Sequence, residues 1–428
     1  MRITILVPGS RGDTQPGAIL GAELARRGND VTLASTDDLT WMGDALGLRT
    51  VPLAFDTRSF LRSDAGQALL TKRGARGYGR GVLEQKMLIA TAWQAAVLEA
   101  CRSADVIVAS NLVMDEASCV AEAMGVPFVG LHFAPWRPNR AYAAHAMTVR
   151  RLVLPLRLAT HHLVAQAEWK ATAAYVNTFR RSLDLPETDL PLPTRLAAGN
   201  TLEIQAFGAG LVPELHGWAT RFPVVGFLTP TAEQRLRWHD VQPDEALDEW
   251  LDAGDPPVFF GFGSMPVRDP GAMLAMLTDV CEQLGVRGLI GAGWSAMPIG
   301  VAQRAADRMR LVGPLDHTSV MPRCSVAVHH GGAGTTAASI GAGLPTVVCA
   351  VAFDQPFWGQ RLRDQGLGTW LPFRKADADR LVDAVRPLLD EAVAARTRLV
   401  GARLAVDDAA SAAARLVEDA GRGSHSDR

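Results

Sequence analysis

The sequence predicts an α/β protein with two doubly wound, Rossmann-like parallel-sheet domains. Short apolar segments rich in β-branched residues alternate with helical segments, first in residues 1–220 and again in residues 241–400. This alternation is typical of β-α-β units, in which helices cover both faces of a parallel sheet. Right-handed crossovers place the carboxyl ends of the strands at one edge of each sheet, where we expect ligands to bind.

The 428 residues are enough for two domains that each bury a hydrophobic core. We assign residues 1–220 to the first domain and residues 241–400 to the second. Residues 221–240, which include a polar run after Pro230, are the expected interdomain linker. Residues 401–428 are expected to form a C-terminal helix.

The composition narrows the class of protein. Hydrophobic residues make up 48% of the chain, charged residues 21%, and the formal net charge is −2. These values are typical of a globular protein and give no support for nucleic-acid binding, which favours a basic stripe. No segment reaches the roughly 20 apolar residues of a membrane span, and no signal peptide precedes the first strand. We therefore expect a cytoplasmic protein without a transmembrane segment.

The five cysteines are an odd number and include no CxxC pair. Most of them lie in or beside apolar segments, which favours buried, reduced thiols over disulfides or zinc ligands. They are Cys101, Cys119, Cys281, Cys324 and Cys349.

The apolar segments predict the individual elements. In the first half, strands are expected at residues 3–7, 31–34, 50–53, 106–109 and 126–131, with helical inserts at 55–103 and 139–182. In the second half, strands are expected from Pro257 and at residues 287–290, 325–328 and 344–349. A first helix is expected at residues 18–27, and the chain is expected to close with a helix from 376 and another over 392–421.

A glycine-rich turn follows the strand at 325–328. Its sequence is His-His-Gly-Gly at 329–332, and a helical segment follows at 333–342. The first amides of such a helix have no intrahelical partner, and the helix dipole adds partial positive charge. The turn is therefore suited to phosphate oxygens, to which the His330 side chain could donate a further hydrogen bond. The alternative is a well-capped turn with two incidental histidines.

A second turn follows the first strand and carries Asp13. The Gly9-x-x-Gly12 pattern suggests a dinucleotide site, but the G-x-G-x-x-G fingerprint is interrupted by Arg11 and Thr14, so we do not predict NAD binding. The turn places Asp13 at the carboxyl end of the strand. Asp13 is then either the N-cap of the first helix or a catalytic carboxylate, and these roles are compatible.

Two long motifs resemble those of a known family. Residues 330–360 contain H-G-G-A-G-T-T followed by a D-Q pair, and residues 9–16 read G-S-R-G-D-T-Q-P. Both resemble family 1 nucleotide-sugar glycosyltransferases of the GT-B fold, especially the glycopeptide-antibiotic and sterol enzymes of bacteria and fungi. The resemblance implies two domains facing across a cleft, the acceptor in the first and the donor in the second, with the C-terminal helix crossing back to the first.

The resemblance also implies an activity. We expect a metal-independent, inverting hexosyltransferase that uses a UDP- or TDP-sugar as co-substrate and needs no cofactor. Asp13 would be the general base, although Asp354 is an alternative, and Asp354 and Gln355 would bind the donor sugar. The donor diphosphate is expected to contact Ser264, His330, Gly332, Ala333, Gly334 and Thr335. The nucleoside is expected beside Trp294 and Leu315.

The acceptor is expected to be a bulky apolar small molecule such as an antibiotic or other natural product, a sterol or a lipid. Aromatic, histidine and methionine side chains of the first half are the candidate acceptor contacts: Met87, Trp93, His132, Phe133 and Trp136. Two other functions remain open. A nucleotide-sugar epimerase of the same fold would need no acceptor, and a non-catalytic auxiliary protein should have lost the motifs.

Overall fold

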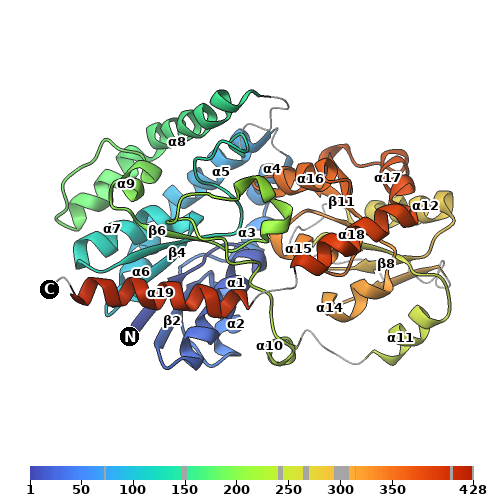
Figure 1. The fold of residues 1–428 in the computed structure, drawn as a ribbon, viewed down its shortest axis with the longest axis horizontal. Helices are drawn as coiled ribbons and strands as arrows, with labels where there is room; N and C mark the ends of the chain where they lie inside the picture. Colours follow the sequence, from blue (N-terminus) through green and yellow to red (C-terminus); the bar gives the residue numbers. More distant parts are fainter. Residues whose placement is uncertain are drawn as a thin grey trace. The chain divides into compact units, whose positions relative to one another are not determined.

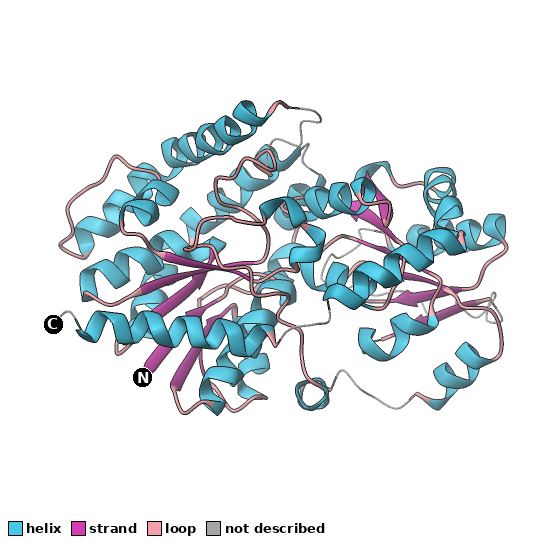
Figure 2. Cartoon of the chain, in the orientation of Figure 1, coloured by secondary structure: helices cyan, strands magenta, loops and turns pink. Residues whose placement is uncertain are grey.

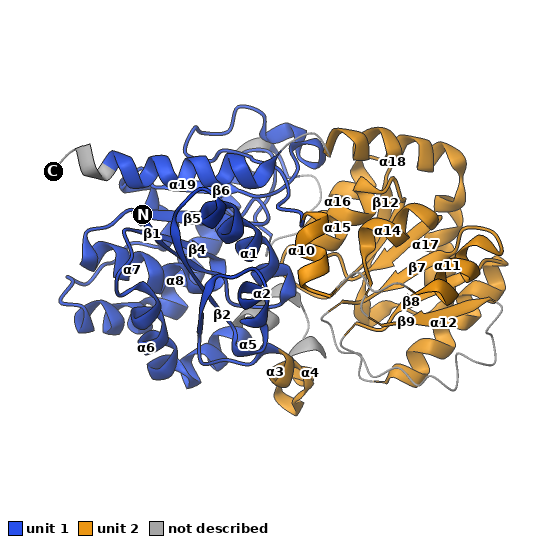
Figure 3. Ribbon diagram, turned by 90° about the horizontal axis from the view of Figure 1, so that it is seen from below, with its two compact units in different colours: residues 1–57, 79–230, 407–428 blue, residues 58–78, 231–406 orange. Residues whose placement is uncertain are grey.

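The structure is a computed structural model, and it comprises two compact units (Figures 1 and 3). It describes residues 1–71, 74–145, 152–239, 244–263, 269–293, 308–313, 315–404 and 408–426. Unit 1 consists of residues 1–57, 79–230 and 407–428, and unit 2 of residues 58–78 and 231–406. Residues 221–230 of the expected linker therefore group with unit 1, and residues 401–406 of the expected C-terminal helix group with unit 2.

Unit 1 is built on a parallel six-stranded sheet, with helices on its faces (Figure 2). Its strands are β1 (Arg2–Leu6), β2 (Asp30–Ser35), β3 (Arg49–Pro52), β4 (Val106–Ser110), β5 (Phe128–His132) and β6 (Leu202–Gln205). The strand order is β3-β2-β1-β4-β5-β6, the doubly wound arrangement with its topological switch point between β1 and β4. Five of these strands confirm the prediction, and β6 was missed because its four residues include the charged Glu203.

Unit 2 repeats the same topology. Its strands are β7 (Val258–Gly261), β8 (Gly288–Gly291), β9 (Met309–Val312), β10 (Val326–His329), β11 (Thr346–Ala350) and β12 (Gly368–Pro372). The order β12-β11-β10-β7-β8-β9 places the switch point between β7 and β10. The two parallel sheets confirm the predicted doubly wound α/β fold.

Several helices pack on the strands of the two sheets. In the N-terminal half they are α1 (Arg11–Arg26), α2 (Trp41–Asp44), α3 (Thr57–Arg62), α4 (Asp64–Thr71), α5 (Gly74–Leu88), α6 (Ala90–Cys101), α7 (Met114–Met124), α8 (Leu154–Ser182) and α9 (Leu192–Ala198). The others are α10 (Ala232–Arg237), α11 (Glu245–Asp252), α12 (Pro270–Leu284), α14 (His317–Val320), α15 (Ala333–Gly341), α16 (Gln355–Asp364), α17 (Ala378–Val385), α18 (Glu391–Leu404) and α19 (Ala409–Ser426). All five cysteines are buried and unpaired, as predicted.

Two helix predictions were wrong. The first helix begins at Arg11 rather than at residue 18, because Ser10 and Asp13 form a capping box and the helix tolerates Pro16 in its interior. The predicted helix over residues 392–421 is two helices, α18 and α19. The second of these belongs to unit 1.

Hydrogen bonds to the Glu418 carboxylate connect α19 to the segment between α1 and β2. Arg27 Nη2 donates to Glu418 Oε2 at 2.7 Å, and Asn29 Nδ2 donates to Glu418 Oε1 at 2.8 Å. Helix α19 lies along α1, as Figure 1 shows. These hydrogen bonds link the last helix of the chain to unit 1.

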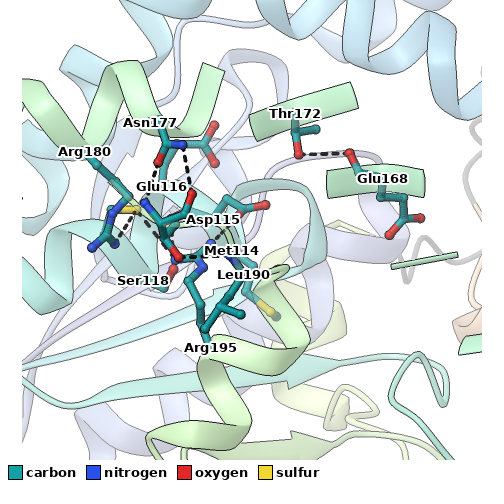
Figure 4. Close-up of polar contacts among 12 residues, drawn as sticks. Met114, Asp115, Glu116, Ser118, Glu168, Thr172, Asn177, Arg180, Leu190 and Arg195 are labelled. Atoms are coloured by element: carbon teal, nitrogen blue, oxygen red, sulfur yellow. Dashed lines mark hydrogen bonds and ion pairs between the residues drawn. The ribbon is translucent and has the colours of Figure 1, made fainter. Parts of the chain in front are cut away.

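Polar contacts also join α7 to the helices packed over it (Figure 4). Arg195 of α9 pairs with Asp115 of α7, and Arg180 of α8 donates to both carboxylate oxygens of Glu122 at 2.6 and 2.8 Å. The Arg180 side chain is only 4% exposed, whereas that of Glu122 is 46% exposed, so the pair lies at the edge of the helical layer and is partly screened by solvent. These contacts hold the helical layer of unit 1 together.

Candidate active site

The predicted phosphate-binding turn lies at the topological switch point of unit 2, where strand β10 ends beside β7. Gly331 has φ of +89°, a left-handed conformation that favours glycine. A Cβ on Gly331 would lie 2.4 Å from Val348 Cγ1 and 3.3 Å from Gln355 Cβ. Glycine is therefore required by both the backbone conformation and the packing, and the turn lies directly against the start of α16.

His330 is packed between two glycines. A Cβ on Gly263 would lie 2.9 Å from His330 Cε1, and a Cβ on Gly332 would lie 2.6 Å from His330 Nε2. Burial lowers the pKa of His330 to about 4, against a smaller opposing effect of the Gly261 backbone, so the imidazole is neutral near pH 7. Its Nδ1 is buried and has no hydrogen-bond partner among the described residues. The ring is therefore neutral, and its Nε2 lies against Gly332 at the start of α15.

The N-terminus of α15 carries no side-chain cap within the described part of the chain. Gly332 is the N-cap, and the first intrahelical bond runs from Thr336 N to Gly332 O at 2.9 Å. The amides of the three residues between them have no intrahelical partner. Helices α12 and α17 of unit 2 begin differently, because the side chains of Asp269 and Asp377 cap them. The α15 N-terminus therefore offers bare amides beside the His330 ring, an arrangement suited to an anion.

His329 has a different environment from its neighbour. It is fully buried, its Nδ1 accepts from Gly331 N at 2.9 Å, and its Nε2 lies 3.3 Å from Ser339 Oγ. Burial lowers the pKa of His329 well below its ordinary value, so it is neutral. Of the two histidines, His330 is the one whose ring lies against the N-terminal glycine of α15.

The Asp354-Gln355 pair begins α16, beside the same turn. Asp354 is half-buried, and its Oδ2 accepts from Trp358 Nε1 at 2.8 Å. Gln355 Oε1 accepts from the amides of Val351 and Ala352 at 2.7 and 3.2 Å, which makes this side chain a cap of the loop. Phe353 has φ of +54°, a costly conformation for a non-glycine residue that is characteristic of functional loops.

Asp13 lies at the switch point of unit 1, in the first turn of α1. Its Oδ2 accepts from Ser10 N at 2.8 Å and from Ser10 Oγ at 3.0 Å, so Ser10 is the N-cap and Asp13 is the third helical residue. Its Oδ1 has no hydrogen-bond partner among the described residues. Burial raises the pKa of Asp13, although the bonds from Ser10 oppose that rise. Ser10 therefore holds the carboxylate through Oδ2. Because its pKa is raised, Asp13 is a stronger base than an exposed aspartate.

Comparisons with known proteins identify the family. Residues 3–143 match the glycosyltransferase family 28 N-terminal domain, and residues 300–418 match the C-terminal domain of erythromycin biosynthesis protein CIII-like proteins. An uncharacterized glycosyltransferase of Mycobacterium tuberculosis is 33% identical over 427 residues, which cover 99% of each chain. The chain is a family 1 glycosyltransferase of the GT-B fold. 

More distant relatives agree with this assignment. A sterol 3-beta-glucosyltransferase of Arabidopsis thaliana is 28% identical over 415 residues, covering 92% of this glycosyltransferase and 61% of the plant chain. The structure of a glycosyltransferase of kitacinnamycin superposes with a TM-score of 0.67 at 19% identity, covering 98% of both chains. The glycosyltransferase VinC, in complex with dTDP, superposes with a TM-score of 0.65 at 17% identity, covering 99% and 100%. These structures confirm the GT-B fold.

The predicted acceptor contacts of the glycosyltransferase differ in burial and in their partners. Trp93 and His132 are 4% and 0% exposed, respectively; Trp93 lies in the hydrophobic core, and His132 Nε2 lies 2.9 Å from Glu203 Oε2. Trp136 is half-buried and stacks on the His145 ring at 4.4 Å between centroids. The other two are Phe133, which is half-buried, and Met87, which is 52% exposed on α5.

The structure also places the remaining predicted residues. Ser264 and Trp294 lie outside the described residues. Leu315 is half-buried and packs on the apolar cluster that includes Val320 and Met321. Among the described residues, no helix combines the length and the hydrophobicity that a membrane span requires.

Some features of the site were missed from the sequence. Gly9 has φ of +136°, and its Cβ would lie 2.4 Å from Asp13 Oδ2, so only glycine leaves room for the carboxylate. Trp358 supports Asp354 from four residues further along the helix, a spacing that the sequence contains. A cavity of about 310 Å³ in unit 1 is lined by residues 138–141, Leu158 and residues 214–219. No sequence signal pointed to this cavity.

Proposed function

We propose that this glycosyltransferase moves a sugar from a UDP- or TDP-sugar to a hydroxyl group of a bulky apolar small molecule. The transfer is a single displacement with inversion at C1, and no metal ion takes part. The observation that carries the proposal is the uncapped N-terminus of α15 beside the neutral ring of His330.

The leaving group sets the first requirement. When the bond between C1 and the diphosphate oxygen breaks, negative charge grows on the diphosphate, and preorganised donors lower the barrier by binding that charge. The free amides of Ala333, Gly334 and Thr335 and the His330 ring supply such donors, and the α15 dipole adds partial positive charge. The Ser264 hydroxyl is a further candidate donor. This site performs the electrostatic role that a divalent cation plays in other transferases.

The acceptor sets the second requirement. As its hydroxyl oxygen forms a bond to C1, it must lose a proton, and Asp13 Oδ1 is the proposed acceptor of that proton. The raised pKa of Asp13 suits this role, because a more basic carboxylate removes a proton more effectively. The proton therefore ends on Asp13, and the electron pair of the broken bond leaves with the nucleoside diphosphate.

The identities of donor and acceptor are inferred from relatives. A structural neighbour is described in complex with dTDP, and a rhamnosyltransferase neighbour is described with a spinosyn aglycone. A plant relative acts on sterols, as its name states. We therefore propose UDP- and TDP-sugars as donors and a natural product or sterol as acceptor, with Asp354 and Gln355 binding the sugar and Leu315 and Trp294 near the nucleoside.

The test begins with a thermal-shift screen of UDP-, TDP- and GDP-sugars. A donor that stabilises the protein is then incubated with a panel of hydroxylated acceptors, and glycosylated products are measured by mass spectrometry with and without EDTA. We expect stabilisation by a UDP- or TDP-sugar, a product of inverted anomeric configuration, and the same rate in EDTA. Conversion of the donor alone into an epimer would identify an epimerase instead, and stabilisation by no nucleotide sugar would reject the proposal.

A further inference from the structure

We propose that His329 is a positioning residue that fixes the diphosphate-binding turn in the conformation that binds the donor. The inference rests on the proposed function of the α15 N-terminus. His329 is the last residue of β10 and is fully buried, so it does not itself reach a ligand in solvent. It acts through the backbone of the turn that follows it.

The first contact of His329 determines where the turn begins. The Gly331 amide donates to His329 Nδ1 at 2.9 Å. Because this amide points inward to the imidazole, it is satisfied inside the protein and is not one of the ligand donors. With Gly331 held at φ of +89°, the chain leaves the strand so that Gly332 becomes the N-cap of α15.

The second contact ties the same ring to the helix. Since Nδ1 accepts a hydrogen bond, the proton of the neutral imidazole lies on Nε2, which donates to Ser339 Oγ at 3.3 Å. Ser339 Oγ in turn donates to Thr336 O at 3.1 Å, one turn back in α15, and lies 3.1 Å from Thr346 Oγ1 of β11. One imidazole therefore links the turn, the helix and the neighbouring strand.

The chemistry of the ring explains why a histidine is needed. The side chain must accept a hydrogen bond from an amide on one edge and donate one to a hydroxyl on the opposite edge, and it must remain neutral while buried. A neutral imidazole meets all three conditions. An apolar side chain of similar size would fill the space but leave the buried Gly331 amide without a partner.

The direct test compares three variants with the wild type. His329→Leu removes both contacts, and His329→Asn keeps an acceptor oxygen close to the position of Nδ1. Thr397→Val is the matched control, because it removes a buried hydroxyl of unit 2 that donates to Val393 O at 2.8 Å, within α18 and not to the turn. Calorimetry with UDP and TDP measures the dissociation constant, and steady-state kinetics measures the donor KM and kcat.

We expect His329→Leu to weaken nucleoside diphosphate binding and to raise the donor KM by about tenfold or more, corresponding to about 1.4 kcal/mol. We expect His329→Asn to restore binding to within about threefold of the wild type, and Thr397→Val to lower the melting temperature without changing the dissociation constant. Binding by His329→Leu within twofold of the wild type would overturn the inference. A loss in His329→Asn equal to that in His329→Leu would also overturn it.

Hydrogen exchange provides a readout that does not depend on the proposed function. Exchange of a peptide that spans residues 330–340 should accelerate in His329→Leu, remain slow in His329→Asn and be unaffected in Thr397→Val. If the wild type binds neither UDP nor TDP, the proposed donor site is wrong. The exchange rates of the three variants would still show whether His329 fixes the conformation of the turn. If His329→Leu does not fold, Ser339→Ala, which removes the second contact alone, should accelerate exchange in the same peptide; unchanged exchange would overturn the inference.

Discussion

The imidazole of His330 lies so close to Gly332 that a Cβ on this glycine would be 2.6 Å from Nε2. Gly332 is also the N-cap of α15, the residue at which the unpaired amides begin. The side-chain donor and the backbone donors of the proposed diphosphate site are therefore in direct contact. A change at Gly332 should disturb both together.

Gly332→Ala tests this contact. The new methyl group must displace the His330 ring, so we expect nucleoside diphosphate affinity to fall by about tenfold or more, as for the loss of a charge-assisted hydrogen bond of about 1.5–3 kcal/mol. Isothermal titration calorimetry with UDP and TDP measures the change. Gly341→Ala is the matched control, because a Cβ at this position of the same helix would meet nothing within 4 Å. Equal affinity in the two variants would show that the contact does not matter for binding.

Asp13→Asn tests the general base. The amide oxygen can still accept from the Ser10 amide, so the helix cap should largely survive, while the proton acceptor is lost. We expect kcat to fall by about 10² to 10⁴-fold and donor affinity to stay near the wild-type value. Ser10→Ala is the control for capping, with an expected loss of about 1 kcal/mol in stability and little loss of kcat. An Asp13→Asn enzyme that kept most of its kcat would exclude Asp13 as the base.

Substitutions of Gln355 separate its loop-capping role from sugar binding. Gln355→Glu keeps an oxygen for the amides of Val351 and Ala352 but loses the side-chain amide donor, so we expect near-normal stability and a raised donor KM. Gln355→Met loses the oxygen as well and leaves two amides unpaired, which should cost about 1–3 kcal/mol for each amide that stays buried. Thermal denaturation and donor kinetics distinguish the two effects. An unchanged donor KM in Gln355→Glu would limit Gln355 to a structural role.

Stability should fall in mild acid because of His330. Burial lowers its pKa to about 4 in the folded protein, whereas an exposed histidine has a pKa near 6.5. The unfolded chain therefore binds a proton first, so this contribution to stability is complete above about pH 6.5 and is lost as the pH falls towards 4. Between pH 7 and 5 we expect His330 to account for about 1–2 kcal/mol. Denaturant unfolding of the wild type and His330→Gln should show a smaller pH dependence in the variant; parallel curves would contradict this.

Glu203 should be a stability determinant of unit 1. Burial alone would raise its pKa, but Arg137 and His132 outweigh that effect and bring it to about 2. Glu203→Gln leaves Arg137 buried opposite an uncharged group, which should cost about 3–5 kcal/mol in thermal or denaturant unfolding. Glu187→Gln removes an exposed ion pair with Arg181 and should change stability by less than about 1 kcal/mol. Similar losses in the two variants would contradict the buried network.

The sequence by itself determined the two doubly wound domains, most of their strands and the strand-turn-helix units that carry Asp13 and His330. These features are local. A strand is recognised by its run of apolar β-branched residues, and the turn by glycines whose backbone freedom no other residue has. The resemblance of residues 9–16 and 330–360 to glycosyltransferase motifs depended on the same short stretches.

Only the tertiary structure decided what surrounds each side chain. The sequence does not distinguish a core tryptophan from a ligand contact, and Trp93 is buried. It also does not show that Gly9 makes room for the Asp13 carboxylate, or that His329 binds the Gly331 amide while the His330 ring packs on Gly332. Two adjacent histidines acquire different environments because the residues around each ring, such as Ser339 beside His329 and Gly263 beside His330, come from other parts of the chain.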